Sequence, residues 1–221
     1  MIGGLARAPD LSVERRDYSR VQGKVEDQNL FVPLTAGGKT VHWIVDTGAK
    51  RFVVSESEAQ ALSLTVAHAN LQAMDDNGGH QKVNIATVPT LEMGNIRLHN
   101  VGMTVIPDSA PPRSLLPAGE RGILGLPTIL RLGTLRWTRD GAVEAAFPTK
   151  RRGEPNLCFG GFNPLTPVVV EGRTLDFVFD TGNGGRNLPA RSRRESRGVV
   201  RCRSQTPHFA PARMIAAHRP S

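Results

Sequence analysis

The alternation of apolar and polar residues along the chain predicts short strands separated by turns. The first strand patterns are residues 30–34, 41–45 and 52–54. Further strands are expected at residues 71–74, 82–88, 91–93, 96–98, 101–106, 134–138 and 142–147. Two short helices are expected, one over residues 55–62 and one with Pro127 in its first turn. The pattern therefore predicts an all-β protein.

Charge divides the chain into a neutral body and a basic end. The net charge is +8, and nine arginines against one acid lie from Arg186 onward, so residues 1–185 sum to zero. A neutral body lacks the fixed cations that phosphate recognition needs, so no specific nucleic-acid partner is expected. No apolar run approaches the ~18 residues of a membrane span. The start has no secretory signal, so the chain as written is expected in the cytoplasm, although an intact gene product could be exported.

The residues that commonly bind metals show no ligand pattern. Cys158 and Cys202 lack metal-site spacing and are expected to be free thiols, and the six histidines form no HExxH motif. A Walker loop and a dinucleotide fingerprint are also missing from the sequence. We therefore expect neither a metal nor a cofactor.

The chain repeats itself at an offset of 134. Three apolar residues precede Asp46-Thr47-Gly48, and three precede Asp180-Thr181-Gly182. The other matched pairs are Pro33 with Pro167, Gly38 with Gly172, and Thr40 with Thr174. One Asp-Thr-Gly is as readily an ordinary turn after a strand. Two copies in the same register favour a shared function instead.

The duplicated motif suggests acid–base chemistry. An apolar strand would deliver each aspartate into a cleft, threonine would hydrogen-bond to its counterpart, and glycine would let backbone and water approach closely. Two neighbouring carboxyl groups cannot both ionise easily, so they share one proton. One then acts as the base that activates a water molecule, and the other protonates the peptide carbonyl that the water attacks.

The residues around this motif resemble the retropepsin-like aspartyl proteases, in particular bacterial forms. The resemblance is carried by residues 44–49, by Asn77-Gly78-Gly79 where the family has its flap, and by Gly122-Ile123-Leu124-Gly125. It implies a closed β fold, a peptide or protein substrate under the flap, and no cofactor. It also implies two lobes, from two chains or from one duplicated chain. The active-site loop would be supported by Thr47, Gly48, Ala49, Thr181, Gly182, Ile123, Leu124 and Gly125.

The second lobe is expected to be incomplete. The first lobe takes 119 residues, from Asn29 to Phe147, whereas only 60 remain from Phe162. Apolar periodicity stops near Leu188, as after a frameshift or an erroneous gene end; a genuine basic tail that binds acidic partners is the alternative. The expected divisions are a polar lead-in (1–28), a complete lobe (29–147), a connector (148–164), a partial second lobe (165–189) and an Arg-rich disordered tail (190–221).

The sequence thus predicts an aspartic-type endopeptidase that uses Asp46 and Asp180. Two other interpretations stay open. The chain could be a non-catalytic remnant that binds peptides or partners, or the first lobe could form a homodimer in which two copies of Asp46 make the catalytic pair.

Overall fold

The computed structural model describes residues 12–15, 18–74, 79–110, 116–146, 157–161, 163–182 and 213–216. The strands of the first part of the chain are β1 (Ser12–Arg15), β2 (Ser19–Gln22), β3 (Lys24–Glu26), β4 (Asn29–Ala36), β5 (Lys39–Asp46), β6 (Phe52–Ser55), β7 (Thr65–Met74), β8 (His80–Met93), β9 (Ile96–Ile106), β10 (Gly122–Gly125), β11 (Thr134–Trp137) and β12 (Ala142–Ala145). They are followed by β13 (Cys158–Gly160), β14 (Asn163–Val170), β15 (Arg173–Val178) and β16 (Arg213–Ala216). The helices are α1 (Glu56–Ala61) and α2 (Leu126–Leu132). The chain is all-β, as the sequence predicts.

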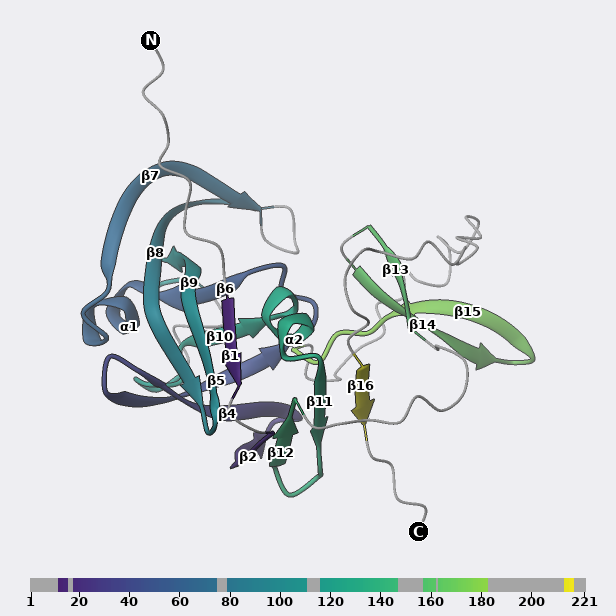
Figure 1. The fold of residues 1–221 in the computed structure, drawn as a ribbon. Helices are drawn as coiled ribbons and strands as arrows, with labels where there is room; N and C mark the ends of the chain where they lie inside the picture. The colour runs from purple at the N-terminus through teal and green to yellow at the C-terminus, as the bar shows by residue number, and fades with distance from the viewer. Residues whose placement is uncertain are drawn as a thin grey trace.

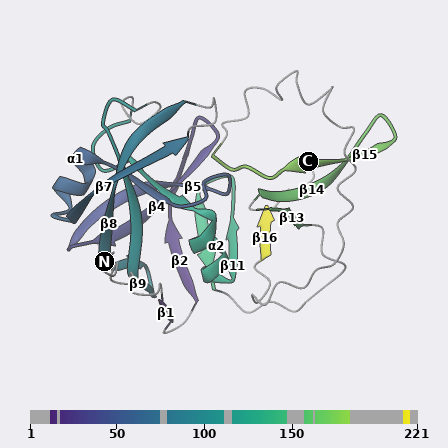
Figure 2. The ribbon, with the colours of Figure 1, turned by 90° about the horizontal axis from the view of Figure 1, so that it is seen from above.

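The largest sheet closes on itself. Its strand order is β1-β9-β6-β10-β5-β4-β8-β7, and β8 also pairs with β9, so the strands from β9 to β8 form a barrel. Figure 1 shows this barrel in purple to teal, with β13, β14 and β15 in green beside it; Figure 2 shows the same separation from above. Closure leaves no free edge among the six barrel strands. The expected closed β fold is confirmed.

The barrel core is built from alternate residues of each strand. On β4 and β5 the inward side chains are Leu30, Val32, Leu34, Ala36, Val41, Trp43 and Val45, and all are buried. β10 is buried at all four positions because it lies between parallel β5 and antiparallel β6. A Cβ on Gly122 would lie 2.3 Å from the Trp43 ring, so only glycine lets the indole pack across this strand.

The two predicted helices are present and begin as expected. Ser55 is the N-cap of α1, where its hydroxyl accepts a hydrogen bond from the Glu58 amide at 3.2 Å. Pro127 lies in the first turn of α2, where its missing N–H leaves no hydrogen bond unmade. Both helix starts are therefore set by local sequence.

Three expectations about strands are wrong. Residues 1–28 were expected to be a polar lead-in, but β1, β2 and β3 lie within them. β1 and β3 join the large sheet through main-chain hydrogen bonds to β9 and β4, which require no apolar pattern. The patterns at 82–88 and 91–93 belong to one strand, β8, and those at 96–98 and 101–106 belong to β9. The ladder continues on both sides of Pro89, and Asn100, at the opposing position, has a left-handed φ of 57°.

The sequence repeat is also a structural repeat, and it is longer than the sequence indicates. β13, β14 and β15 reproduce β3, β4 and β5 in the same register: Lys24 pairs with Phe31 as Cys158 pairs with Leu165. The β4–β5 and β14–β15 ladders match pair for pair. The repeat therefore runs from residue 24 to 48 and again from 158 to 182.

The two copies differ in what covers them. Leu34 and Ala36 are 1% and 0% exposed in the barrel, whereas their counterparts Val168 and Val170 are each 39% exposed. In the barrel this face packs against the other strands, but β13, β14 and β15 form a separate sheet that pairs with no further described strand. The second copy thus presents an apolar face that the first copy buries.

A short strand, β16, lies within the expected tail. Most of that tail is outside the described residues, but β16 pairs in parallel with β11, which departs from the expectation of disorder for these four residues. β11 had a free edge on that side, and such an edge readily accepts another strand. β16 is held to β11 by hydrogen bonds between main chains. Such bonds do not require an alternation of apolar residues, so the sequence pattern of the tail did not predict this strand.

Cys158 is disulfide-bonded, so the expectation of a free thiol is wrong. Thiol pairing depends on which segments meet in space, and sequence spacing does not reveal this.

Candidate active site

The two Asp-Thr-Gly turns follow equivalent strands, β5 and β15. The carboxylate of Asp46 accepts hydrogen bonds from the amides of Gly48 at 2.8 Å and Ala49 at 3.0 Å. Asp180 accepts one from the amide of Gly182 at 3.0 Å. Each loop therefore orients its own carboxylate with backbone amides.

The two loops are joined by their threonines. The amide of Thr47 donates to the hydroxyl of Thr181 at 3.1 Å, and the amide of Thr181 donates to the hydroxyl of Thr47 at 3.1 Å. Each hydroxyl then donates to a main-chain carbonyl before the opposite Asp motif: Thr181 to Val45, at the end of β5, at 2.7 Å, and Thr47 to Phe179, which directly follows β15. Thr47 is buried, so these bonds are shielded from water. The network fixes the distance between the two aspartates.

The aspartates face one another across the glycines. A Cβ on Gly48 would lie 2.6 Å from Cγ of Asp180, and a Cβ on Gly182 would lie 2.2 Å from Cγ of Asp46. Any side chain at either glycine would therefore displace the opposite carboxyl group. The structure thus brings together two aspartates that are distant in the sequence.

The environment favours the protonated form of Asp46. Burial raises its pKa to about 6, and the negative charge of Asp180 and a hydrogen bond with that carboxyl act in the same direction. The amides of Ala49 and Gly48 oppose this shift because they stabilise the charged form. Asp46 therefore holds a proton in mildly acidic solution.

The strand β10 lies directly against the first Asp loop. Ile123, Leu124 and Gly125 pair in register with Ile44, Val45 and Asp46. The amide of Leu126 donates to the carbonyl of Ala49 at 2.9 Å. A Cβ on Gly125 would lie only 2.2 Å from the carbonyl oxygen of Arg51, so the two backbones touch here. The loop is consequently held from behind by main chain.

A buried carboxylate that the sequence analysis did not single out also supports this region. Glu58 on α1 is 2% exposed and accepts hydrogen bonds from the indole N–H of Trp43 at 3.1 Å and from the amide of Gly119 at 2.9 Å. It thus ties β5 to the segment that leads into β10. Its place three residues after Ser55 was visible in the sequence, but only as a helix-capping pattern.

The expected flap is described only in part. Asn77 and Gly78 lie outside the described residues, and Gly79 immediately precedes β8. The hairpin that carries them consists of β7 and β8, which pair from Thr65 with Thr87 to Met74 with His80. The register shifts between Ala67 and Leu71, which marks a bulge along β7.

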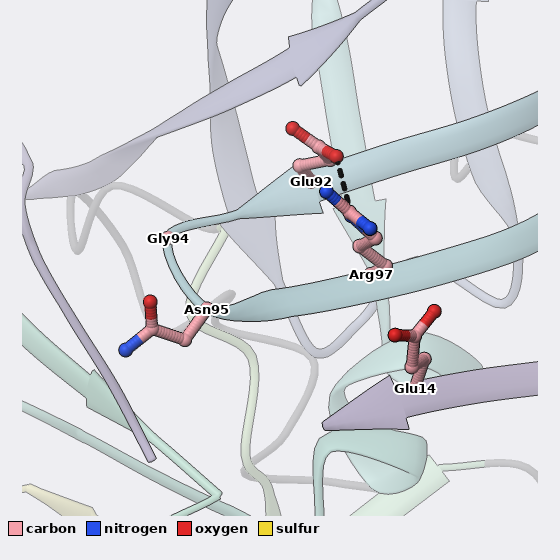
Figure 3. A pocket seen from close by; sticks show the side chains of 5 residues that line it. All are labelled: Glu14, Glu92, Gly94, Asn95 and Arg97. Carbon is pink, nitrogen blue, oxygen red and sulfur yellow. Dashed lines mark hydrogen bonds and ion pairs between the residues drawn. The ribbon is translucent and has the colours of Figure 1, made fainter. Parts of the chain in front are cut away.

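A small hollow elsewhere on the barrel does not include the aspartates. It has a volume of about 170 Å³ and is lined by Glu14, Glu92, Gly94, Asn95 and Arg97. Figure 3 shows Glu92 and Arg97 on the paired strands β8 and β9, joined by an ion pair of 2.7 Å. Arg97 already neutralises one carboxylate of this hollow, so the hollow offers little to a cation.

Metal-binding clusters and membrane-spanning helices are both missing from the described ranges. There, no group of three or more His, Cys, Asp or Glu side chains is placed to hold a metal ion. Neither of the two described helices has the length and apolar character needed to cross a bilayer.

Comparisons with known proteins relate part of the chain to a known family. Residues 32–128 match the family model described as aspartyl protease. A retropepsin-like aspartic protease from Rickettsia conorii is 18% identical, covering 62% of this chain and 94% of its own, with a TM-score of 0.43. The EIAV protease complexed with the inhibitor HBY-793 is 18% identical over 47% of this chain and 86% of its own (TM-score 0.37). The retroviral protease-like domain of Ddi1 from Leishmania major is 17% identical over 47% and 75% (TM-score 0.30).

A search of curated proteins found no match. The matched segment begins on β4, includes Asp46, the β7–β8 hairpin and β10, and ends on α2. Its strands β4, β5, β6, β8, β9 and β10 are those of the closed barrel. Over residues 32–128, somewhat less than half of the chain, the protein thus matches the aspartyl protease family, a family of peptidases.

Proposed function

We propose that the chain is an aspartic endopeptidase whose catalytic pair, Asp46 and Asp180, is contained in a single chain. One observation carries the proposal: each glycine of the two motifs lies against the carboxyl group of the other motif. Such a position leaves no room for a side chain at either glycine, so nothing larger than hydrogen separates each loop from the opposite carboxyl group. Water is the molecule that peptide hydrolysis requires.

The mechanism follows from the shared proton. The ionised aspartate removes a proton from the bound water as its oxygen attacks the peptide carbonyl carbon, and the protonated aspartate donates its proton to the carbonyl oxygen. The tetrahedral intermediate then collapses, the C–N bond breaks, and the leaving nitrogen receives a proton from the pair. The raised pKa of Asp46 supports the presence of this proton in mildly acidic solution.

The remaining residues of the site support the pair. The crossed hydrogen bonds of Thr47 and Thr181 hold the loops at a fixed separation, since a displacement of about 1 Å can cost 10²-fold in rate. The amides of Gly48, Ala49 and Gly182 orient the carboxylates. We assign Ile123, Leu124 and Gly125 the role of a rigid support, and Asn77, Gly78 and Gly79 that of the flap.

The same geometry argues against a homodimer that uses two copies of Asp46. In such a dimer a second Asp46 would have to occupy the place beside Gly48 that Asp180 now fills. We therefore propose one complete lobe (29–147), a connector, a partial second lobe and a basic tail (190–221). The structural repeat supports moving the start of the second lobe from residue 165 back to Cys158.

Hydrolysis of an unfolded protein substrate between pH 3 and 7 tests the proposal. Asp46→Asn and Asp180→Asn should each lower the rate by at least ~10²-fold because either change removes half of the acid–base pair. Asp140→Asn, at an exposed aspartate in the turn between β11 and β12, is the matched control and should retain the parental rate. Full activity in Asp180→Asn would contradict the internal pair and favour the homodimer.

A further inference from the structure

Two cations follow the first Asp turn directly. Lys50 and Arg51 lie between Ala49 and the start of β6, and both are exposed. Their backbone is tightly held. The amide of Ala49 donates to the Asp46 carboxylate at 3.0 Å, and the carbonyl of Arg51 lies against Gly125. The two positively charged side chains therefore extend from a rigid loop that also holds a catalytic carboxylate.

The cations lie within reach of a substrate. Lys50 directly follows Ala49, whose amide contacts Asp46, and successive Cα atoms are only about 3.8 Å apart. A lysine or arginine side chain adds several ångströms of flexible reach beyond its Cα. A charged group of a peptide bound at the aspartates would then come within a Debye length, ~8–10 Å, of both cations.

Neither cation is neutralised within the part of the chain that the structure describes. There, Lys24 pairs with Glu120, Arg97 with Glu92 and Arg136 with Glu144. No such carboxylate partner is found for Lys50 or Arg51 in those ranges. Unpaired cations beside a binding site attract anionic ligands and repel cationic ones.

The repeat makes this charge one-sided. In the second copy of the sequence, the counterparts of Lys50 and Arg51 are Gly184 and Gly185, which carry no side chain. Lys50 and Arg51 thus place positive charge after the first Asp motif, whereas the matching positions after the second motif carry none. A substrate would meet this charge on one side of its scissile bond.

We propose that Lys50 and Arg51 select peptides that carry Asp or Glu close to the scissile bond on one side; this inference rests on the proposed peptidase function. The two side chains are specificity residues and take no part in the acid–base step. Exposed ion pairs are each worth up to about 1 kcal/mol, which corresponds to about fivefold in binding. Their effect should shrink as salt is raised, because solvent-exposed charges are screened.

The test compares otherwise identical peptides that carry Glu, Gln or Lys at each of three positions on either side of the cleaved bond. The parent should cleave the Glu peptide faster than the Gln peptide, by up to about fivefold in kcat/KM for each ion pair formed, at positions on one side only. The Lys peptide should be the slowest. The ratio of Glu to Gln should fall to about one in Lys50→Met/Arg51→Met and should be retained in Arg139→Met, an exposed arginine in the β11–β12 turn. Equal cleavage of all three peptides, or a ratio that survives the double substitution, would overturn the inference.

Binding separates this inference from the proposed function. The same peptides, fluorescently labelled, are titrated into Asp46→Asn and into Asp46→Asn combined with Lys50→Met/Arg51→Met, with fluorescence anisotropy as the readout. Preferential binding of the Glu peptide that disappears in the combined variant supports the charge selection, even if the parent cleaves nothing. Cleavage by the parent without any Glu preference in binding or rate contradicts the charge selection and leaves the peptidase proposal standing.

Discussion

Thr47 and Thr181 exchange a pair of hydrogen bonds of equal length, each amide donating at 3.1 Å to the hydroxyl of the other residue. The two residues are distant in sequence, and each hydroxyl also donates to the main-chain carbonyl two residues before the opposite threonine. The second Asp motif is therefore joined to the first by side chain to main chain bonds at the site itself. Three predictions follow from this join and from the surrounding packing.

Removing the hydroxyl of Thr181 should weaken the contact between the two Asp motifs. Thr181→Val removes an acceptor for the Thr47 amide and a donor to the Val45 carbonyl, so two main-chain groups lose their partners. We expect a loss of about 2–3 kcal/mol in the free energy of unfolding. Peptidase activity should fall by at least about tenfold because Asp180 loses its fixed position.

Urea denaturation and a peptide cleavage assay measure these two effects. Thr181→Ser, which keeps the hydroxyl, is the matched control and should stay close to the parent in both. If Thr181→Val and Thr181→Ser behave alike, the crossed hydrogen bonds do not hold the motifs together.

Gly125 should not accept a larger residue. A Cβ there would lie 2.2 Å from the Arg51 carbonyl oxygen and 2.9 Å from that of Ala49, and both are main-chain atoms that cannot rotate away. Gly125→Val should therefore cost at least about 3 kcal/mol or prevent folding. Thermal unfolding followed by circular dichroism measures the change.

Gly102→Val provides the comparison, because Gly102 also lies in a strand, β9, but a Cβ there meets nothing within 4 Å. This variant should unfold within about 1 kcal/mol of the parent. Equal stability of the two variants would mean that β10 does not lie against the Asp46 loop.

Stability should depend on pH through Asp46. Its pKa is raised from 3.8 to about 6 by burial and by the charge of Asp180, so between these values the folded state holds a proton that the unfolded chain has released. This contribution is complete below about pH 4 and is lost as the pH rises through about 6. A rise in pKa of this size corresponds to at most ~3 kcal/mol.

Urea denaturation from pH 4 to pH 7.5 measures how the free energy of unfolding depends on the protonation of Asp46. The parent should lose stability over the range, and Asp46→Asn should lose less and be the more stable protein at pH 7.5. In Asp180→Asn the neighbouring charge is gone, so the pKa of Asp46 should be lower, and the decline should be smaller and end at a lower pH. Parallel curves for all three proteins would show that Asp46 does not carry a raised pKa.

The sequence by itself determined the local features of the protein. Apolar strands before each Asp-Thr-Gly, the capping serine of α1 and the proline of α2 could all be recognised, because each depends on residues within a few positions of one another. The repeat at an offset of 134 was visible as well, since it requires only comparison of the chain with itself. These signals were enough to predict an all-β fold and two candidate aspartates.

Only the tertiary structure decided what these features do together. Asp46 and Asp180 face one another because a barrel strand and a strand of the second sheet bring their ends to the same place, and no local pattern encodes that meeting. Main-chain pairing, which is indifferent to side-chain pattern, added β1 and β3 and carried β8 past Pro89. The role of Glu58 likewise emerged from packing, because its partners Trp43 and Gly119 are distant in sequence and a buried carboxylate is stable only where such donors converge.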